Sequence, residues 1–283
     1  MRLNIAAWRY ARWAAGTAAL LFAVGLAHGQ PAAPGKKAPA VAETASQAEA
    51  RAILTRMAEF LGGAHGFSVT VRAGYDAVQR SGQKIEFGEM RKVTLSRPDR
   101  LRVEGERSDG AKMLTVFTGK EIMLIDAASN VYATAPQPGD VDQTIVYFVR
   151  DLGMRLPLAV LLVSQLPAEL KDRVRSVDYV EKTSILGSTT HHLAARTDTV
   201  DFQIWVADGD KPLPQRVVIT YRMAKGEPQF WAQFSDWNLA PAIADSTFLA
   251  EPPSGAQKVA FAAQLPRVSP VARKSSAAKG AKR

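Results

Sequence analysis

Histidine combines acid–base chemistry with metal binding more readily than other side chains, and this chain of 283 residues has four of them. His28 lies in the N-terminal segment, and His65 lies in a turn after a predicted helix. His191 and His192 are adjacent in a predicted strand, where neighbouring side chains point to opposite faces of the sheet. We therefore do not expect one metal ion to bind both. Since the chain has no cysteine, we predict neither a metal site nor a cofactor.

Carboxylates are the next candidates for chemistry, and four of them gather at Asp198, Asp201, Asp208 and Asp210. A calcium loop would need alternating oxygen ligands that close on a glutamate, and this segment has no glutamate. We interpret the cluster as solvated turn residues. Two carboxylates placed for glycoside hydrolysis leave no sequence signature, because any two can meet in a fold. The chain has no Gly-x-Ser-x-Gly nucleophile elbow, and we predict that it is not an enzyme.

Two tryptophans are a more informative feature than any titratable group. Trp205 lies in a predicted strand at 201–207 and Trp231 in one at 228–237, each on the more polar face of its strand. No continuous apolar stripe includes them. We predict that both tryptophans line the concave side of a curved sheet; the alternative is that both lie on its convex face.

Strands predicted at 111–117 and 120–126 are apolar on both faces. An antiparallel sheet with one wet face would be polar at alternate residues. Both faces must therefore be covered, by helices or by an apolar lumen. The pattern alone leaves two architectures open, which are a curved sheet around a cavity and a sandwich core without one.

The elements that position these residues are mostly strands joined by short turns. A helix with Thr44 or Ser46 as its cap is predicted to end at Gly62-Gly63. A second helix is predicted over 140–153, and the apolar segment 157–166 opens with a proline, as helices often do. The fold class is thus mainly antiparallel β with helices (α+β). About eleven strands are expected, at 67–75, 83–95, 100–107, 111–117, 120–126, 129–134, 174–184, 189–196, 201–207, 214–223 and 228–237.

The ends of the chain differ in composition from its middle. Residues 1–29 resemble a secretory signal peptide, with Arg2, Arg9 and Arg12 before a 14-residue apolar run and small side chains at Ala27 and Gly29. That run is too short for a membrane span of about 20 residues, so we expect cleavage before Gln30 and export to the periplasm. Without a cysteine to acylate, we expect no lipid anchor.

The net charge of +9 belongs to these ends. Residues 30–43 read as a flexible linker, and residues 263–283 read as a disordered tail with six basic residues and no acid. The predicted domain at 44–262 is nearly neutral, so we expect no nucleic-acid partner. The basic tail could instead bind an anionic membrane surface.

Several short motifs, in their order and spacing, resemble one protein family. They are Arg97-Pro98-Asp99-Arg100-Leu101, Phe117-Thr118-Gly119-Lys120, Asp201-Phe202-Gln203-Ile204-Trp205, Pro212-Leu213-Pro214 and Pro252-Pro253-Ser254-Gly255-Ala256. Together they are similar to uncharacterised predicted periplasmic proteins of the LolA/LolB-like superfamily, whose name refers to outer-membrane lipoprotein carriers.

The resemblance implies a curved, incompletely closed β-barrel of about eleven strands with helices covering the open side. It also implies a non-enzymatic carrier or binding protein for an apolar, lipid-like ligand. The segment 157–166 would then act as a lid, and the predicted ligand-binding residues are Leu158, Leu161, Leu162, Trp205 and Trp231. The alternative function is an envelope sensor or interaction module that binds an envelope protein partner with the same fold.

Overall fold

The computed structural model describes residues 43–151 and 156–261. The predicted signal peptide, the tail 263–283 and the linker up to residue 42 lie outside the described residues. None of the described helices is long and apolar enough to cross a membrane.

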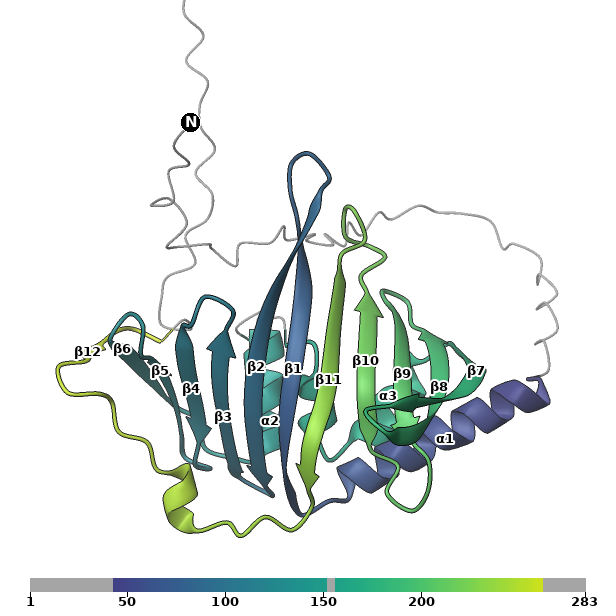
Figure 1. Cartoon of the computed structure of the whole chain (residues 1–283). Helices are drawn as coiled ribbons and strands as arrows, with labels where there is room; N and C mark the ends of the chain where they lie inside the picture. The colour runs from purple at the N-terminus through teal and green to yellow at the C-terminus, as the bar shows by residue number, and fades with distance from the viewer. Residues whose placement is uncertain (1–42, 152–155, 262–283) are drawn as a thin grey trace, which may run out of the picture. The chain divides into compact units, whose positions relative to one another are not determined.

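One curved, open sheet of twelve strands forms the body of the described chain (Figure 1). Its spatial order is β12-β6-β5-β4-β3-β2-β1-β11-β10-β9-β8-β7. Strands β1 to β6 form one meander and β7 to β11 form another, and the two meanders join where β1 pairs with β11. All pairs are antiparallel except β12 with β6. The strands are β1 (Gly66–Val78), β2 (Lys84–Ser96), β3 (Arg100–Arg107), β4 (Lys112–Phe117), β5 (Glu121–Asp126), β6 (Val131–Pro136), β7 (Ser176–Ile185), β8 (Ser188–Arg196), β9 (Asp201–Ala207), β10 (Pro214–Thr220), β11 (Gln229–Asn238) and β12 (Gln257–Lys258).

The predicted fold class and all eleven predicted strands are confirmed. The additional strand, β12, has two residues, which are too few for an alternating pattern to reveal. The edges of the sheet, β12 and β7, are not paired with each other, so the barrel does not close.

Helix α1 (Ala45–Gly62) begins with a capping box between Thr44 and Gln47. Its apolar stripe packs against β7, β8 and β9. Helix α2 (Val141–Val146) has Asp140 as its cap and continues as the π-helical turn η2 (Tyr147–Asp151). Both predicted helix starts are therefore confirmed.

The predicted helix over 157–166 is wrong. This stretch holds only a 3₁₀ turn, η3 (Ala159–Leu162), and α3 (Leu166–Arg173) follows it. The proline that opens a helix is Pro167, not Pro157. Side chains elsewhere bond the backbone of residues 162 and 164, so this segment does not need helical hydrogen bonds there.

The two faces of the sheet differ in what covers them. The helices lie on one face, here called the covered face, and most of the buried core lies between them and the sheet. The opposite face is here called the open face. On β9, Ile204 and Val206 are buried on the covered face, while Gln203 and Trp205, which alternate with them, are half-buried on the open face.

The C-terminal segment contacts the sheet at β3 and at β6. After β11 the chain passes the ends of the neighbouring strands, forms the 3₁₀ turn η4 (Asp245–Phe248) and reaches β12 at the edge of the sheet (Figure 1). Phe248, Val116 and Ile125 are all buried but lie outside the main core. On the two strands predicted to be covered on both faces, Val116 and Ile125 are thus buried, whereas Met113 is 47% exposed.

Candidate functional site

The candidate site lies on the covered face, under residues 156–164, here called the covering segment. Leu161 is buried, and Leu158 and Leu162 are half-buried against the core. These three leucines therefore pack on the core from an irregular segment instead of a helix. The apolar residues Leu156 and Val160 of the same segment also pack on the core.

One arginine fastens the covering segment to the rest of the fold. Arg97, in the turn between β2 and β3, donates from Nη1 to the carbonyl oxygen of Leu162 at 2.8 Å and from Nε to that of Ala64 at 3.0 Å. Its side chain is only 13% exposed, and Asp142 lies 3.6 Å away. Burial lowers the pKa of Arg97, and the charge of Asp142 opposes this effect. Nη2 is buried and has no partner among the described residues.

Helix α2 also holds the covering segment, through Asp142. The carboxylate of Asp142 accepts hydrogen bonds from the backbone N–H of Ser164 at 3.0 Å and from its hydroxyl at 2.7 Å. Arg97 and Asp142 thus hold the two ends of residues 162–164. No local sequence pattern marks either residue as functional, because the roles of both depend on contacts between distant parts of the chain.

A cleft of about 390 Å³ lies where the covering segment meets the ends of β8 to β10. Its apolar lining comes from Pro157, Val200, Ile219 and Tyr221, and Ile219 and Tyr221 also pack against the main core. Charged residues of the α3 end and the β8–β9 turn form its rim. These are Asp172, Arg173, Arg175 and Asp198.

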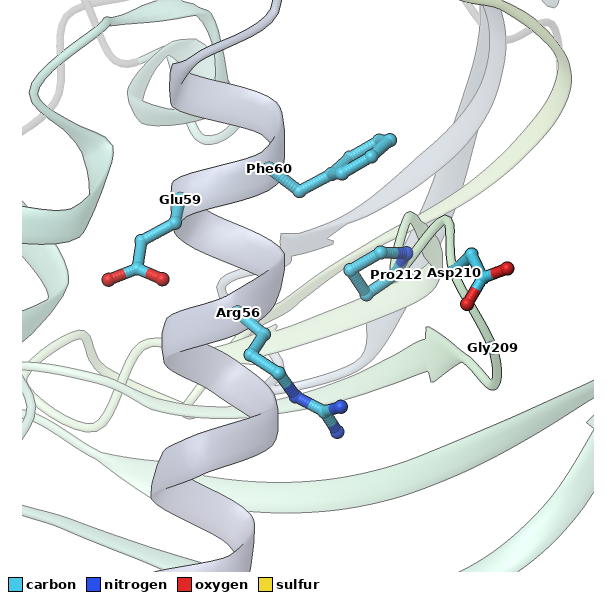
Figure 2. Close-up of a pocket in the computed structure, with 6 residues that line it drawn as sticks. All are labelled: Arg56, Glu59, Phe60, Gly209, Asp210 and Pro212. Atoms are coloured by element: carbon cyan, nitrogen blue, oxygen red, sulfur yellow. The ribbon is translucent and has the colours of Figure 1, made fainter.

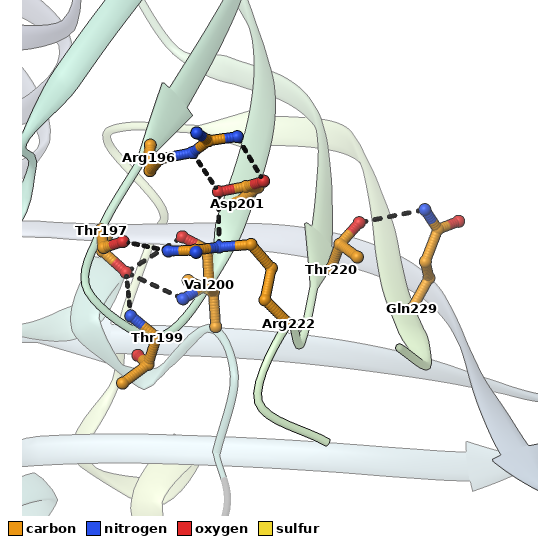
Figure 3. A network of polar contacts seen from close by, with 8 residues as sticks. All are labelled: Arg196, Thr197, Thr199, Val200, Asp201, Thr220, Arg222 and Gln229. Carbon is orange, nitrogen blue, oxygen red and sulfur yellow. Dashed lines mark hydrogen bonds and ion pairs between the residues drawn. The ribbon is translucent and has the colours of Figure 1, made fainter. Parts of the chain in front are cut away.

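The wall of this cleft is braced by a polar network (Figure 3). Asp201 forms ion pairs with Arg196 at 2.9 Å and with Arg222 at 2.8 Å. Arg222 also donates to the carbonyl oxygen of Thr197 in the β8–β9 turn. The pKa of Asp201 is lowered, first by its hydrogen bond to Arg196. The network fixes the turn that presents Thr199 and Val200 to the cleft.

A second hollow, of about 340 Å³, lies between α1 and the β9–β10 turn. Arg56 and Phe60 point from α1 toward the turn that holds Gly209, Asp210 and Pro212 (Figure 2). None of the residues that line this hollow belongs to the covering segment, and its mixed charges do not define a ligand.

The structure does not bring the predicted tryptophans and leucines together. Trp205 and Trp231 lie on the open face, opposite the covered face where the leucines pack. The alternation of each strand places them there, since their neighbours Ile204 and Phe230 point into the core. The tryptophans and the leucines therefore cannot line one shared space.

The two adjacent histidines point to opposite faces, as predicted. His191 contacts Tyr179 and Asp208, whereas His192 stacks on Trp205 with ring centroids 4.1 Å apart. Asp208 also pairs with Lys182 at 2.7 Å. Within residues 43–151 and 156–261, no three His, Asp or Glu side chains are grouped so that they could hold a metal ion.

A comparison with family models matches residues 50–262 to a family described as "Predicted periplasmic protein (DUF2092)". The chain belongs to this family. The resemblance to uncharacterised predicted periplasmic proteins is thus confirmed. Among curated proteins, no match to this DUF2092 member is found.

Solved structures are similar to this DUF2092 chain at low identity. An uncharacterized conserved protein from Thermus thermophilus is 14% identical, with a TM-score of 0.44 over 75% of this chain and 99% of that one. The lipoprotein LppX from Mycobacterium tuberculosis is 13% identical, with a TM-score of 0.45 over 71% and 100%. A LolA superfamily protein from Nitrosomonas europaea is 13% identical, with a TM-score of 0.36 over 71% and 97%.

Proposed function

We propose that this protein is a periplasmic, non-enzymatic carrier or binding protein for an apolar, lipid-like ligand. The ligand would lie between the covering segment and the covered face of the sheet. One observation carries the proposal: the covering segment packs on the core through apolar side chains, while Arg97 and Asp142 hold its backbone through a few polar contacts.

If this segment separates from the sheet, it loses these polar contacts and the apolar contacts of its leucines. A ligand chain that replaced Leu158, Leu161 and Leu162 against the core would restore the lost apolar contacts. Each methylene group removed from water contributes about 0.8 kcal/mol. An acyl chain would therefore bind by taking the place of these leucines against the core, and it would be released when the leucines return.

The cleft beside Pro157 is the proposed entrance. Ligand sites are commonly apolar hollows of about 300–1,000 Å³ with a few polar groups, and the cleft volume lies in this range. An apolar chain entering past Val200 would meet Ile219 and Tyr221, which pack on the main core.

The location is proposed on the family description and on the predicted signal peptide. Export would remove residues 1–29. The six basic residues after residue 263 would attract an anionic membrane surface, at about 1 kcal/mol for each residue near the surface. Such attraction would bring the carrier close to a source of lipid.

The test compares lipids retained by three versions of the protein purified from the periplasm. The wild type, Val200→Trp and Val180→Trp are extracted with organic solvent, and the extracts are analysed by mass spectrometry. Val200 lines the cleft, whereas Val180 is half-exposed on β7 and serves as the matched control. We expect one apolar species in the wild type and the control and much less in Val200→Trp. Equal amounts in all three would contradict the proposed entrance.

A further inference from the structure

The open face carries a cross-strand row of aromatic and cationic side chains over β8, β9, β10 and β11. His192 stacks on Trp205, and the guanidinium carbon of Arg216 lies 5.7 Å from the ring centre of Trp205. The same carbon lies 5.5 Å from the ring centre of Trp231. Arg216 is thus held between two indoles, which fixes its position through cation–π contacts.

Trp231 extends this row to β1 and β2. Gly74 of β1 is its direct cross-strand neighbour. A Cβ atom on Gly74 would lie only 2.6–2.9 Å from three indole atoms, so the ring lies over that glycine. The indole nitrogen donates to a carboxylate oxygen of Glu86 on β2 at 3.0 Å. The indole rings of Trp205 and Trp231 are therefore held in place by the side chains around them.

The charges on this face are unequally matched. Asp201 and Asp76 on this face form ion pairs, with Arg196 at 2.9 Å and with Lys84 at 3.9 Å. Glu86 accepts a hydrogen bond from the neutral indole of Trp231, and Glu181 lies 3.8 Å from Nδ1 of His192. Arg216 and Arg72, in contrast, form no ion pair within the described part of the chain.

These two arginines lie on the same row of the sheet. Arg216 is the cross-strand neighbour of Gln233, and Gln233 is the neighbour of Arg72. Strands lie about 4.8 Å apart, so the two positions are about 10 Å apart. A fixed guanidinium beside a tryptophan is typical of the residues that dominate protein interfaces, and its planar donors match a carboxylate in a two-bond geometry.

We propose that this part of the open face binds an acidic, extended segment of a partner protein. One carboxylate would pair with Arg216 between the two tryptophans, and a second would pair with Arg72. The site is separate from the covered face, so the proposal does not depend on lipid binding. Positive potential that meets acidic side chains would favour the correct partner and speed its association.

A protein partner is favoured over a membrane by the shape of this patch. Membrane contact needs apolar side chains that protrude into the lipid. Trp205 and Trp231 are instead half-buried, each beside Arg216, and Trp231 also covers Gly74. Among the described residues of this row, only Met90, which is 46% exposed, is an exposed apolar side chain.

The test uses a ten-residue glutamate peptide and the indole N–H signals in NMR spectra of the protein purified from the periplasm. The described chain has three tryptophans, and Trp237 donates instead to the carbonyl oxygen of Pro214. We expect saturable shifts of the Trp205 and Trp231 signals, weaker at high salt, with Trp237 unmoved. This local readout does not respond to peptide bound elsewhere, such as at a basic tail.

Three variants make the test specific. Arg216→Gln should weaken the peptide affinity at least fivefold. Arg72→Gln should weaken it less while leaving the tryptophan row intact, because Arg72 is exposed. Arg80→Gln, in the exposed β1–β2 turn, removes one charge away from this face and should bind like the wild type. Shifts that persist fully in both Arg216→Gln and Arg72→Gln would overturn the proposal. So would shifts caused by phosphatidylglycerol vesicles but not by the peptide.

Discussion

Arg97 and Leu162 are 65 residues apart in the sequence, yet the Arg97 side chain bonds the Leu162 backbone carbonyl at 2.8 Å. The same guanidinium bonds the carbonyl oxygen of Ala64, next to the end of α1. One side chain therefore joins the β2–β3 turn, the residues that follow α1 and the covering segment. The stability of the fold should therefore depend on Arg97.

Replacing Arg97 with methionine should loosen the covering segment. The change removes charged hydrogen bonds to two carbonyl groups, each of which typically contributes about 1.5–3 kcal/mol. We expect the free energy of unfolding to fall by about 3 kcal/mol and an apolar probe to associate faster. Urea unfolding and stopped-flow fluorescence measure these effects. Arg80→Met is the matched control, and an Arg97→Met protein indistinguishable from it would contradict the assigned role.

Two neighbouring glycines on the open face should respond differently to a methyl group. In Gly74→Ala the new Cβ would overlap the indole of Trp231, so the ring must move and lose its bond to Glu86. In Gly88→Ala the nearest heavy atom, at 3.7 Å, is the carbonyl oxygen of Ala73. We expect a loss of about 1 kcal/mol for Gly74→Ala and a red shift of tryptophan emission, with neither in Gly88→Ala. Equal behaviour of both variants would show that Trp231 does not occupy this position.

The C-terminal segment should contribute to the stability of the open face through Phe248. This side chain is 3% exposed, and Arg102 donates to the flanking carbonyl oxygens of Thr247 and Leu249 at 3.3 Å. Phe248→Ala should lower the free energy of unfolding by about 3 kcal/mol. Leu249→Ala, at a position 69% exposed, should change it by less than about 0.5 kcal/mol. Chemical denaturation compares the two, and a small effect of Phe248→Ala would mean that the segment is loosely held.

Asp208 should make stability depend on pH at the acid end. Hydrogen bonds first from Lys182 and then from His191 lower its pKa from 3.8 to about 2. The contribution of Asp208 is therefore fully present above pH 3.8 and is lost as the pH falls toward 2. Asp208→Asn should remove this part of the pH dependence, as measured by urea unfolding between about pH 5 and pH 2. Parallel curves for variant and wild type would contradict these partnerships.

Local patterns account for what the sequence predicted correctly. Alternation revealed the eleven long strands, and side-chain caps at Thr44 and Asp140 revealed the starts of two helices. Both signals arise within a few residues and survive in almost any tertiary context. The same alternation correctly separated Trp205 and Trp231 from the core stripes of their strands.

The remaining features depend on contacts between distant segments. Alternation distinguishes two faces of a strand but does not say which face the helices cover, so the tryptophans were placed with the leucines. The covering segment is apolar enough for a helix, but Arg97 and Asp142 bond its backbone instead. The row from His192 to Trp231 depends on the register of four strands, which single-strand patterns do not specify.

The most direct test of the carrier account is an equilibrium titration of the delipidated protein with the fluorescent fatty acid cis-parinaric acid. The account predicts saturable binding of one probe per protein, displacement by unlabelled oleic acid, and weaker binding by Val200→Trp than by Val180→Trp. Fluorescence that rises without saturation, in a protein shown to be folded by its thermal melt, would contradict the account.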